Sequence, residues 1–346
     1  MQMLEGYTFD DVLLVPNYNG IRSRQDVSTR AQMGPLTFEL PIISSNMDTV
    51  TGSEMATFMA KAGGLGILHR FLSIEENIAE LDRVPAELRA HVGISIGIGD
   101  AGMERAEALV SAGATILCVD VAHGHAKSVN RTIKALRARF ADNVCVIAGN
   151  VASYAGADYL AAAGADVIKV GIGGGSVCTT RIKTGFGVPQ LSAIMMCRGV
   201  DRPLIADGGI RTPGDAVKAL AAGASFVMLG GLLAGTLETP GEVRTRRAAD
   251  GTEHQVKRFR GMASREAQED FMGQMAEWKT AEGVSLDVRV TGSAEAVVRD
   301  MMGGIRSGLT YAGASTIADL QRKAQFIRVS SATSNESRAH ALDRGA

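Results

Sequence analysis

The chain has 346 residues, of which 46% are hydrophobic and 21% are charged, and its formal net charge is −1. This composition is typical of a globular protein with a sizeable core, and the length fits one large domain or two ordinary ones. Because positive and negative charges nearly balance, no overall positive field would attract nucleic acid or an anionic membrane, so any anionic ligand must be bound by a local site.

Cysteine usage and the amino terminus indicate the compartment. The four cysteines lie far apart, with no CxxC pair, which predicts reduced thiols rather than a disulfide framework or a structural zinc site. Residues 1–14 are acidic where a signal peptide would be basic, and no run approaches the roughly 18 apolar residues of a membrane span. We expect a soluble, cytoplasmic protein.

Eight short apolar runs alternate with stretches of helical spacing. The expected strands are 41–45, 66–69, 92–98, 116–121, 144–151, 167–172, 203–206 and 226–229. The expected helices are 53–62, 74–81, 102–112, 125–140, 155–163 and 213–222, and four of them end in AGG or AGA, where glycine suits a helix C-cap. Apolar strands between amphipathic helices indicate a covered parallel sheet. Eight units favour a closed (β/α)8 TIM barrel over a Rossmann-like sheet, since no GxGxxG opens the first unit.

In such a barrel the residues that follow each strand form the active site. The sixth run leads into a loop where Gly171 and 173–175 precede Cys178, Thr180 and Arg181. Dense glycine lets the backbone approach a ligand closely, and a cysteine beside hydroxyls and an arginine is a candidate nucleophile. The alternative is a glycine turn with a small, buried and inert cysteine.

The seventh and eighth runs are each followed by a glycine pair, at 208–209 and 230–231. Barrels commonly bind phosphate there through backbone N–H groups, which predicts a phosphorylated ligand. Beyond them, 232–290 is long, polar and irregular, and we expect a functional flap rather than a solvated insertion. Residues 293–309 are expected to form the last helix. Residues 1–330, flap included, are expected to form one domain, and 331–346 a disordered tail.

Distinctive sequence motifs occur along most of the chain. They are SNMDTV (45–50), DVAHGH (120–125), IAGNV (147–151), VGIGGGSVCTTR (170–181), IADGGIRTPGD (205–215), GMAS (261–264) and GGIRSGLTYAGA (303–314). Together they resemble the IMP dehydrogenase and GMP reductase family, over about residues 8–329. The resemblance implies a (β/α)8 barrel whose Cys178 attacks carbon 2 of a purine nucleoside monophosphate.

Within that family the resemblance favours the GMP reductase branch. The stretch 73–92, between the second and third units, has no room for the CBS pair that dehydrogenases usually carry. Residues 261–290 lack the Arg-Tyr pair with which dehydrogenases activate water, whereas AEWKTAEG (276–283) and QFIRVSS (325–331) are similar to reductases. The expected reaction is NADPH-dependent reductive deamination of GMP to IMP and ammonia. The alternatives are an IMP dehydrogenase without CBS domains that oxidises IMP to XMP with NAD, a non-catalytic purine nucleotide sensor, and a flavin-dependent barrel.

The resemblance also implies roles for single residues. Cys178 is the nucleophile, and Thr180 and Glu282 protonate the leaving amine; the alternatives are a hydroxyl that caps a backbone group and a solvent-exposed flap carboxylate. The substrate would be bound by Ser176, Asp207, Gly208, Gly209, Gly230, Gly231, Gly261, Met262, Ala263, Ser264, Lys279 and Gly283. NADPH would be bound by Arg70, Asp120, Val121, Ala122 and Ser307, with Ser23 and Arg24 from a neighbouring subunit. Backbone carbonyls of Gly173, Gly175, Cys178 and Arg181 would hold K+, and the family implies a homotetramer.

Two residues depart from the family's pattern. Gly174 stands where proline is common, which should leave the cation-binding loop less restrained. Lys279 stands where reductases often have arginine, which keeps the charge but loses the planar donor fork. His123 and His125 have no third ligand in view, so we expect no transition-metal site.

Overall fold

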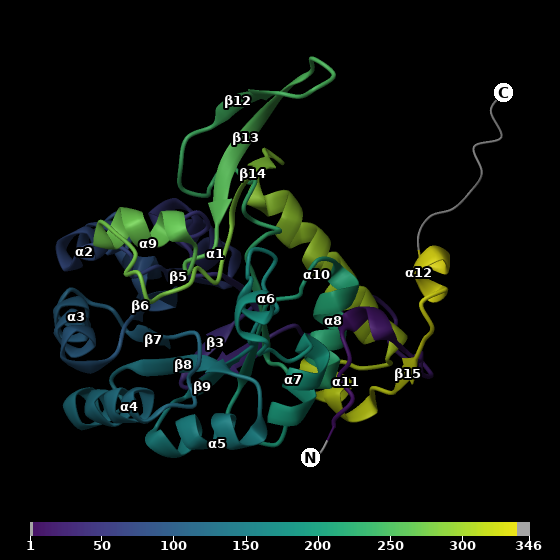
Figure 1. The fold of residues 1–346 in the computed structure, drawn as a ribbon. Coiled ribbons are helices and arrows are strands. Elements are labelled where there is room, and N and C mark those ends of the chain that lie inside the picture. The colour runs from purple at the N-terminus through teal and green to yellow at the C-terminus, as the bar shows by residue number, and fades with distance from the viewer. Residues whose placement is uncertain (1–2, 338–346) are drawn as a thin grey trace.

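The computed structural model describes residues 3–337, and its centre is a closed barrel of eight parallel strands (Figure 1). The strands are β4 (Ile42–Ser44), β5 (Leu65–Leu68), β6 (Val92–Ile96), β7 (Ile116–Asp120), β8 (Cys145–Val151), β9 (Val167–Val170), β10 (Leu204–Asp207) and β11 (Phe226–Leu229). Pairing of β11 with β4 closes the ring. Every strand overlaps a run that the sequence predicts, although β5 begins one residue earlier and β10 ends one residue later than expected. The (β/α)8 barrel is confirmed.

Helices cover the outside of the barrel (Figure 1). They include the six predicted ones, α1 (Ser53–Ala62), α2 (Ile74–Asp82), α3 (Gly99–Ser111), α4 (Lys127–Phe140), α5 (Tyr154–Ala163) and α8 (Pro213–Ala222), together with α7 (Gln190–Cys197), which was not predicted. The short helix α6 (Thr180–Thr184), also not predicted, lies in the loop that follows β9. The capping box of Ser73 and Glu76 begins α2, and Gly63 ends α1 at φ 87°. These local signals explain why the observed ends of the helices lie close to those that the sequence predicts.

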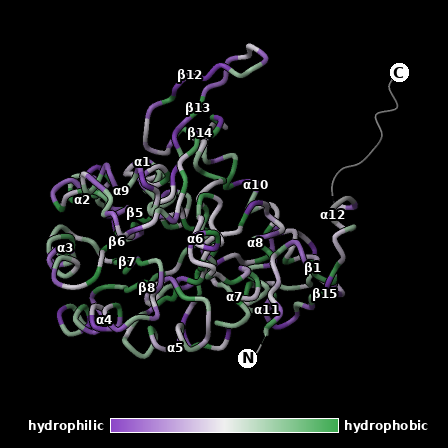
Figure 2. The backbone as a smooth tube through the Cα atoms, in the orientation of Figure 1, coloured by the Kyte–Doolittle hydropathy of each residue, from purple (hydrophilic) through white to green (hydrophobic). Residues whose placement is uncertain are grey.

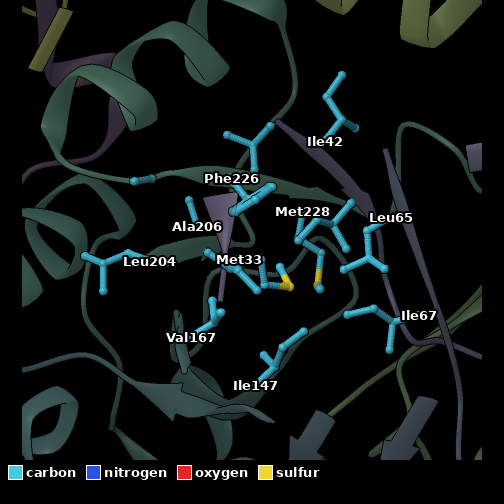
Figure 3. Packing of buried hydrophobic residues seen from close by; sticks show 14 of the residues in the cluster. Met33, Ile42, Leu65, Ile67, Ile147, Val167, Leu204, Ala206, Phe226 and Met228 are labelled. Atoms are coloured by element: carbon cyan, nitrogen blue, oxygen red, sulfur yellow. The ribbon is translucent and has the colours of Figure 1, made fainter. Parts of the chain in front are cut away.

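A hairpin of β2 (Ala31–Met33) and β3 (Leu36–Phe38) covers the amino-terminal end of the barrel. Met33 is fully buried and lies among side chains from the first residues of several strands, including Ile42 and Phe226 (Figure 3). The rings of Phe38 and Phe226 meet edge to face at 5.8 Å. The barrel interior is therefore closed at this end, and hydrophobic residues follow the strands (Figure 2).

The sequence analysis expected the segment 232–290 to be irregular, but the segment contains regular secondary structure. It forms an antiparallel sheet of β12 (Arg244–Arg247), β13 (Glu253–Arg260) and β14 (Ser285–Arg289), with α9 (Arg265–Met272) between the last two strands. The β12–β13 hairpin projects from the barrel (Figure 1). We call residues 232–290 the flap.

The carboxyl-terminal part also corrects one expectation, because the helix α10 (Ala294–Tyr311) is not the last. It is followed by α11 (Ile317–Lys323), by β15 (Phe326–Arg328), which pairs with β1 (Val12–Leu14), and by α12 (Thr333–Glu336). Two short 3-10 helices, Phe9–Asp11 and Ala86–His91, complete the elements of the described chain. Of the predicted disordered tail, residues 338–346 lie outside the described part. None of the helices in residues 3–337 is long and apolar enough to cross a membrane.

Candidate active site

The loop that follows β9 presents the candidate nucleophile at the carboxyl end of the barrel. Cys178 is partly buried, and its Sγ lies 3.1 Å from Thr180 Oγ1. Thr180 is the first residue of the short helix α6. The thiol and the hydroxyl that the sequence pairs are therefore in hydrogen-bond contact, so a proton can pass between the two groups.

The flap lies directly against this loop. Cys178 and Ser264 each form an isolated β-bridge with Gly283. The Thr179 amide donates to the carbonyl oxygen of Glu282 at 2.9 Å, and the Glu282 amide donates to the carbonyl of Ala263 at 3.0 Å. The structure thus brings the predicted segments 261–264 and 282–283 to the cysteine, although they lie far from it in sequence.

An ion pair also fastens the flap to the barrel. Arg260 of β13 donates to Asp48 Oδ2 from Nε at 2.9 Å and from Nη2 at 2.6 Å, and it also binds Asp270 of α9. The side chains of Arg260 and Asp48 are only 14% and 13% exposed, so water screens this ion pair weakly. Met262 lies beside the same pair, with its Sδ 3.3 Å from the Asp48 amide.

The predicted phosphate residues lie together where three strand ends meet. A Cβ added to Gly231 would lie 2.9 Å from Ser176 Oγ, and one added to Gly208 would lie 3.0 Å from the backbone of Gly174. Gly208 and Gly209 have φ values of +99° and +80°, which glycine adopts without strain. The backbone of Gly231 thus lies close to the Ser176 hydroxyl, as a cradle for an anion requires.

A buried charge cluster forms the floor of the mouth. Lys169 Nζ binds Asp120 Oδ1 at 2.9 Å and Asp207 Oδ2 at 2.8 Å, and Asn150 Nδ2 also donates to Asp207 Oδ2 at 2.8 Å. The sequence analysis placed both carboxylates in the site but missed Lys169 and did not assign Asn150. The available signal was a lysine within an apolar run that ends in the Cys178 loop.

The same cluster fixes the ionisation of its members. Burial opposes the charge on Asp120, but the ammonium of Lys169 outweighs burial and lowers the pKa of the carboxyl. Burial likewise opposes the charge on Lys169, and Asp120 and Asp207 outweigh it and raise the lysine pKa. Both groups are therefore charged around neutral pH.

The predicted cofactor residues fall into two places. At the mouth, the Val121 amide binds the Gly149 carbonyl at 3.1 Å, Ala122 follows it, and Arg70 has a buried Nε without a partner within residues 3–337. Arg24 and Ser307 instead line a separate pocket of about 480 Å³ against α10. Ser23, next to Arg24 in the chain, is exposed.

The remaining predicted residues show different environments. In the predicted cation loop, the carbonyl of Gly175 accepts from the Cys178 amide and that of Arg181 from the Gly185 amide. Lys279 is exposed, with its Nζ 5.3 Å from the ring centre of Trp278. Residues 3–337 hold no group of three or more His, Cys, Asp and Glu side chains placed to bind a metal ion.

Cys178 should be the thiol that alkylating reagents reach first. The chain has four free thiols, of which Cys118, Cys145 and Cys197 are buried. Burial raises the pKa of each of these three to about 12, so they carry almost no thiolate at mildly alkaline pH. We expect iodoacetamide to label Cys178 alone in the native protein, as peptide mass spectrometry would show. Labelling of a buried thiol at the same rate would contradict this geometry.

Comparison with known proteins identifies similar chains. A family model described as "IMP dehydrogenase / GMP reductase domain" matches residues 6–340. The GMP reductase of Enterobacter sp. (strain 638) is 39% identical over 332 residues, covering 93% of this chain and 94% of the relative. The inosine-5'-monophosphate dehydrogenase of Nitrosopumilus maritimus is 34% identical over 483 residues, covering 98% of this chain and 99% of the relative. Because that alignment is longer than this chain, the dehydrogenase has residues that this chain lacks.

Two solved structures are also similar. A structure described as inosine 5' monophosphate dehydrogenase from Legionella pneumophila is 56% identical, with a TM-score of 0.84, and the match covers 95% of this chain and 99% of that one. A cysteine-to-alanine variant of GMP reductase from Trypanosoma brucei, in complex with guanosine 5'-monophosphate, is 32% identical with a TM-score of 0.91 and 98% coverage of both chains.

Proposed function

Because this chain belongs to the IMP dehydrogenase and GMP reductase family, we propose that it is a GMP reductase that converts GMP to IMP and ammonia with NADPH. The observation that carries this proposal is the docking of the flap segment 282–283 on the Cys178 loop. This docking supplies a glutamate, Glu282, and the segment 261–290 contains no Arg-Tyr pair to activate water for a dehydrogenase.

The reaction is difficult in one step, because an amine leaves an aromatic carbon poorly and that carbon accepts hydride poorly. Covalent attack divides it into two easier steps. The Cys178 thiolate adds to carbon 2 of GMP, and the 2-amino group leaves as ammonia with a proton relayed through Thr180 and Glu282. The resulting cationic thioimidate lacks two electrons relative to IMP. When bound, NADPH would supply them as hydride at carbon 2, and the carbon–sulfur bond would then break to release IMP and the thiolate.

Binding groups for GMP follow from the same proposal. Asp207 accepts hydrogen bonds from the ribose hydroxyls, and Ser176 with Gly208, Gly209, Gly230 and Gly231 surrounds the phosphate. The base contacts the flap residues. These residues are Gly261, Met262, Ala263, Ser264 and Gly283, with Lys279 at the exposed rim.

The mouth also fits a dinucleotide. Arg70 offers a buried guanidinium nitrogen without a hydrogen-bond partner in the described part of the chain, which suits the extra phosphate of NADPH. Asp120 accepts hydroxyl groups beside Val121 and Ala122. Ser307 is a further cofactor-binding residue, and Ser23 and Arg24 reach the cofactor of a neighbouring subunit in a homotetramer. Light scattering that gives a monomer at micromolar concentration would exclude that arrangement.

A monovalent cation, K+, belongs to the same proposal. Carbonyl oxygens of Gly173, Gly175, Cys178 and Arg181 replace part of its hydration shell. Gln190 Oε1 is a buried acceptor without a protein partner within residues 3–337, and a Cβ at Gly174 would lie 3.4 Å from it. An orphaned acceptor beneath the loop fits a bound cation or its water. Activity that depends on K+ and is not restored by Li+ supports this part of the proposal.

The second candidate is an IMP dehydrogenase without CBS domains. It is favoured by the similarity of 56% to the Legionella structure, whose matched chain has almost no residues beyond those this chain covers. The decisive experiment follows NADPH absorbance and ammonia with two substrate pairs, GMP with NADPH and IMP with NAD. A fall in absorbance with ammonia release from the first pair is the expected result. A rise in absorbance with IMP and NAD, and no change with GMP and NADPH, would establish that the protein is an IMP dehydrogenase.

A further inference from the structure

One charged side chain lies within the barrel wall beneath the mouth. Lys169 is a residue of β9, is only 3% exposed, and points its ammonium at the ends of two other strands. Its partners are Asp120, the last residue of β7, and Asp207, the last residue of β10. A single cation therefore connects carboxylates that belong to non-adjacent strands.

The neighbouring strand is built to admit this side chain. Gly149 of β8 pairs with Lys169, and a Cβ at Gly149 would lie 2.6 Å from the Cβ of the lysine. Any larger residue at position 149 would displace the lysine stem. Asn150, the next residue, donates to the same oxygen of Asp207 as Lys169 does. The position of Lys169 is therefore fixed by packing as well as by charge.

The two carboxylates of this cluster share one directly bonded cation. Two carboxylates face the ammonium of Lys169, and the cluster is also faced by the Cys118 thiol next to Lys169 and by the Arg70 guanidinium and the Asn46 amide next to Asp120. Lys169 and Asn150 both bind Oδ2 of Asp207, which leaves Oδ1 for a ligand. A ligand hydroxyl that donates a hydrogen bond to one carboxylate weakens the attraction between that carboxylate and Lys169. Lys169 then binds the other carboxylate more strongly.

We infer that Lys169 is a positioning residue that couples the nucleotide and dinucleotide subsites through its shared ion pairs with Asp207 and Asp120. The inference rests on the proposed function, which places the ribose of GMP at Asp207 and the dinucleotide at Asp120. Coupling of this kind is reciprocal, so each ligand changes the affinity of the other by the same factor. Lys169 needs no contact with either ligand for this role.

The first test measures GMP affinity by calorimetry with and without saturating NADP+, a pair that cannot react. In the wild type, NADP+ should change the GMP dissociation constant by about fivefold or more. In Lys169→Met this factor should fall towards one, and Lys169→Arg, which keeps the charge, should restore most of it. Lys218→Met is the matched control, because the hydrogen bond of Lys218 within residues 3–337 goes to the Phe9 carbonyl and not to the Lys169 cluster.

The second test uses Asp120→Asn and GMP alone, so that it does not depend on the folding of Lys169→Met. Asp120 does not contact GMP in the proposed arrangement, yet its neutralisation leaves Lys169 paired with Asp207 only. GMP affinity should therefore fall by about fivefold. Unchanged GMP affinity in Asp120→Asn, or an unchanged coupling factor in a folded Lys169→Met protein, would overturn the inference. Failure of the wild type to bind either nucleotide would instead remove the proposed function.

Discussion

Replacement of Cys178 by alanine is expected to abolish turnover and to leave GMP binding intact. Without the thiol no covalent bond to carbon 2 can form, and the uncatalysed exchange of an amine for hydride on an aromatic ring is very slow. The fall in kcat should be at least about a thousandfold. Steady-state NADPH oxidation and calorimetric GMP binding measure the two quantities separately.

The matched control for this prediction is Cys197→Ala. Cys197 ends α7, is buried, and lies outside the mouth, so its loss removes a thiol of the same size without touching the site. It should lower stability slightly and leave kcat unchanged. Turnover in Cys178→Ala close to the wild-type rate would refute the covalent mechanism. Loss of GMP binding together with turnover would mean that the thiol supports the loop rather than the chemistry.

The barrel could be predicted from the sequence because its strands are buried on both faces. Runs such as Val167–Val170 are continuously apolar apart from Lys169, and glycines such as Gly63 mark helix ends by chemistry that acts locally. The β2–β3 hairpin was missed because strands of three residues are too short to show a period. The flap was misjudged for another reason, since β12 is exposed at all four positions and has no apolar face.

Some contacts of the active site could likewise be predicted from the sequence, and others could not. Contact between Cys178 and Thr180 follows from their spacing of two residues on one loop. The partners of Lys169 come from β7 and β10, and nothing near position 169 in the sequence identifies them. Glu282 could be assigned only by resemblance, because its approach to Thr179 depends on how the flap folds back. Long-range charge pairing is a property of the folded barrel, and local patterns do not encode it.

Replacement of Glu282 by glutamine is the second change with a large expected effect. The amide has the shape of the carboxyl group but cannot take up and release a proton, so departure of ammonia should slow. We expect kcat to fall by about a hundredfold to ten-thousandfold, with a much smaller change in GMP affinity. Single-turnover measurement of ammonia release reports this step directly. Glu277→Gln is the matched control, because Glu277 is an exposed carboxylate of the same flap loop and should leave kcat unchanged.

A double variant separates a shared proton relay from two independent contributions. If Thr180 and Glu282 pass the same proton, Thr180→Val made in the wild-type protein should slow ammonia release. The same substitution made in the Glu282→Gln protein should slow it little further, because the relay is already broken. Additive losses would instead mean that the two residues act on different steps. The Thr180 hydroxyl contacts the Cys178 thiol, whereas Glu282 is bound to Thr179 through its backbone. Non-additive losses in the double variant would therefore show that Glu282 of the flap shares in transferring the proton that the leaving amine requires.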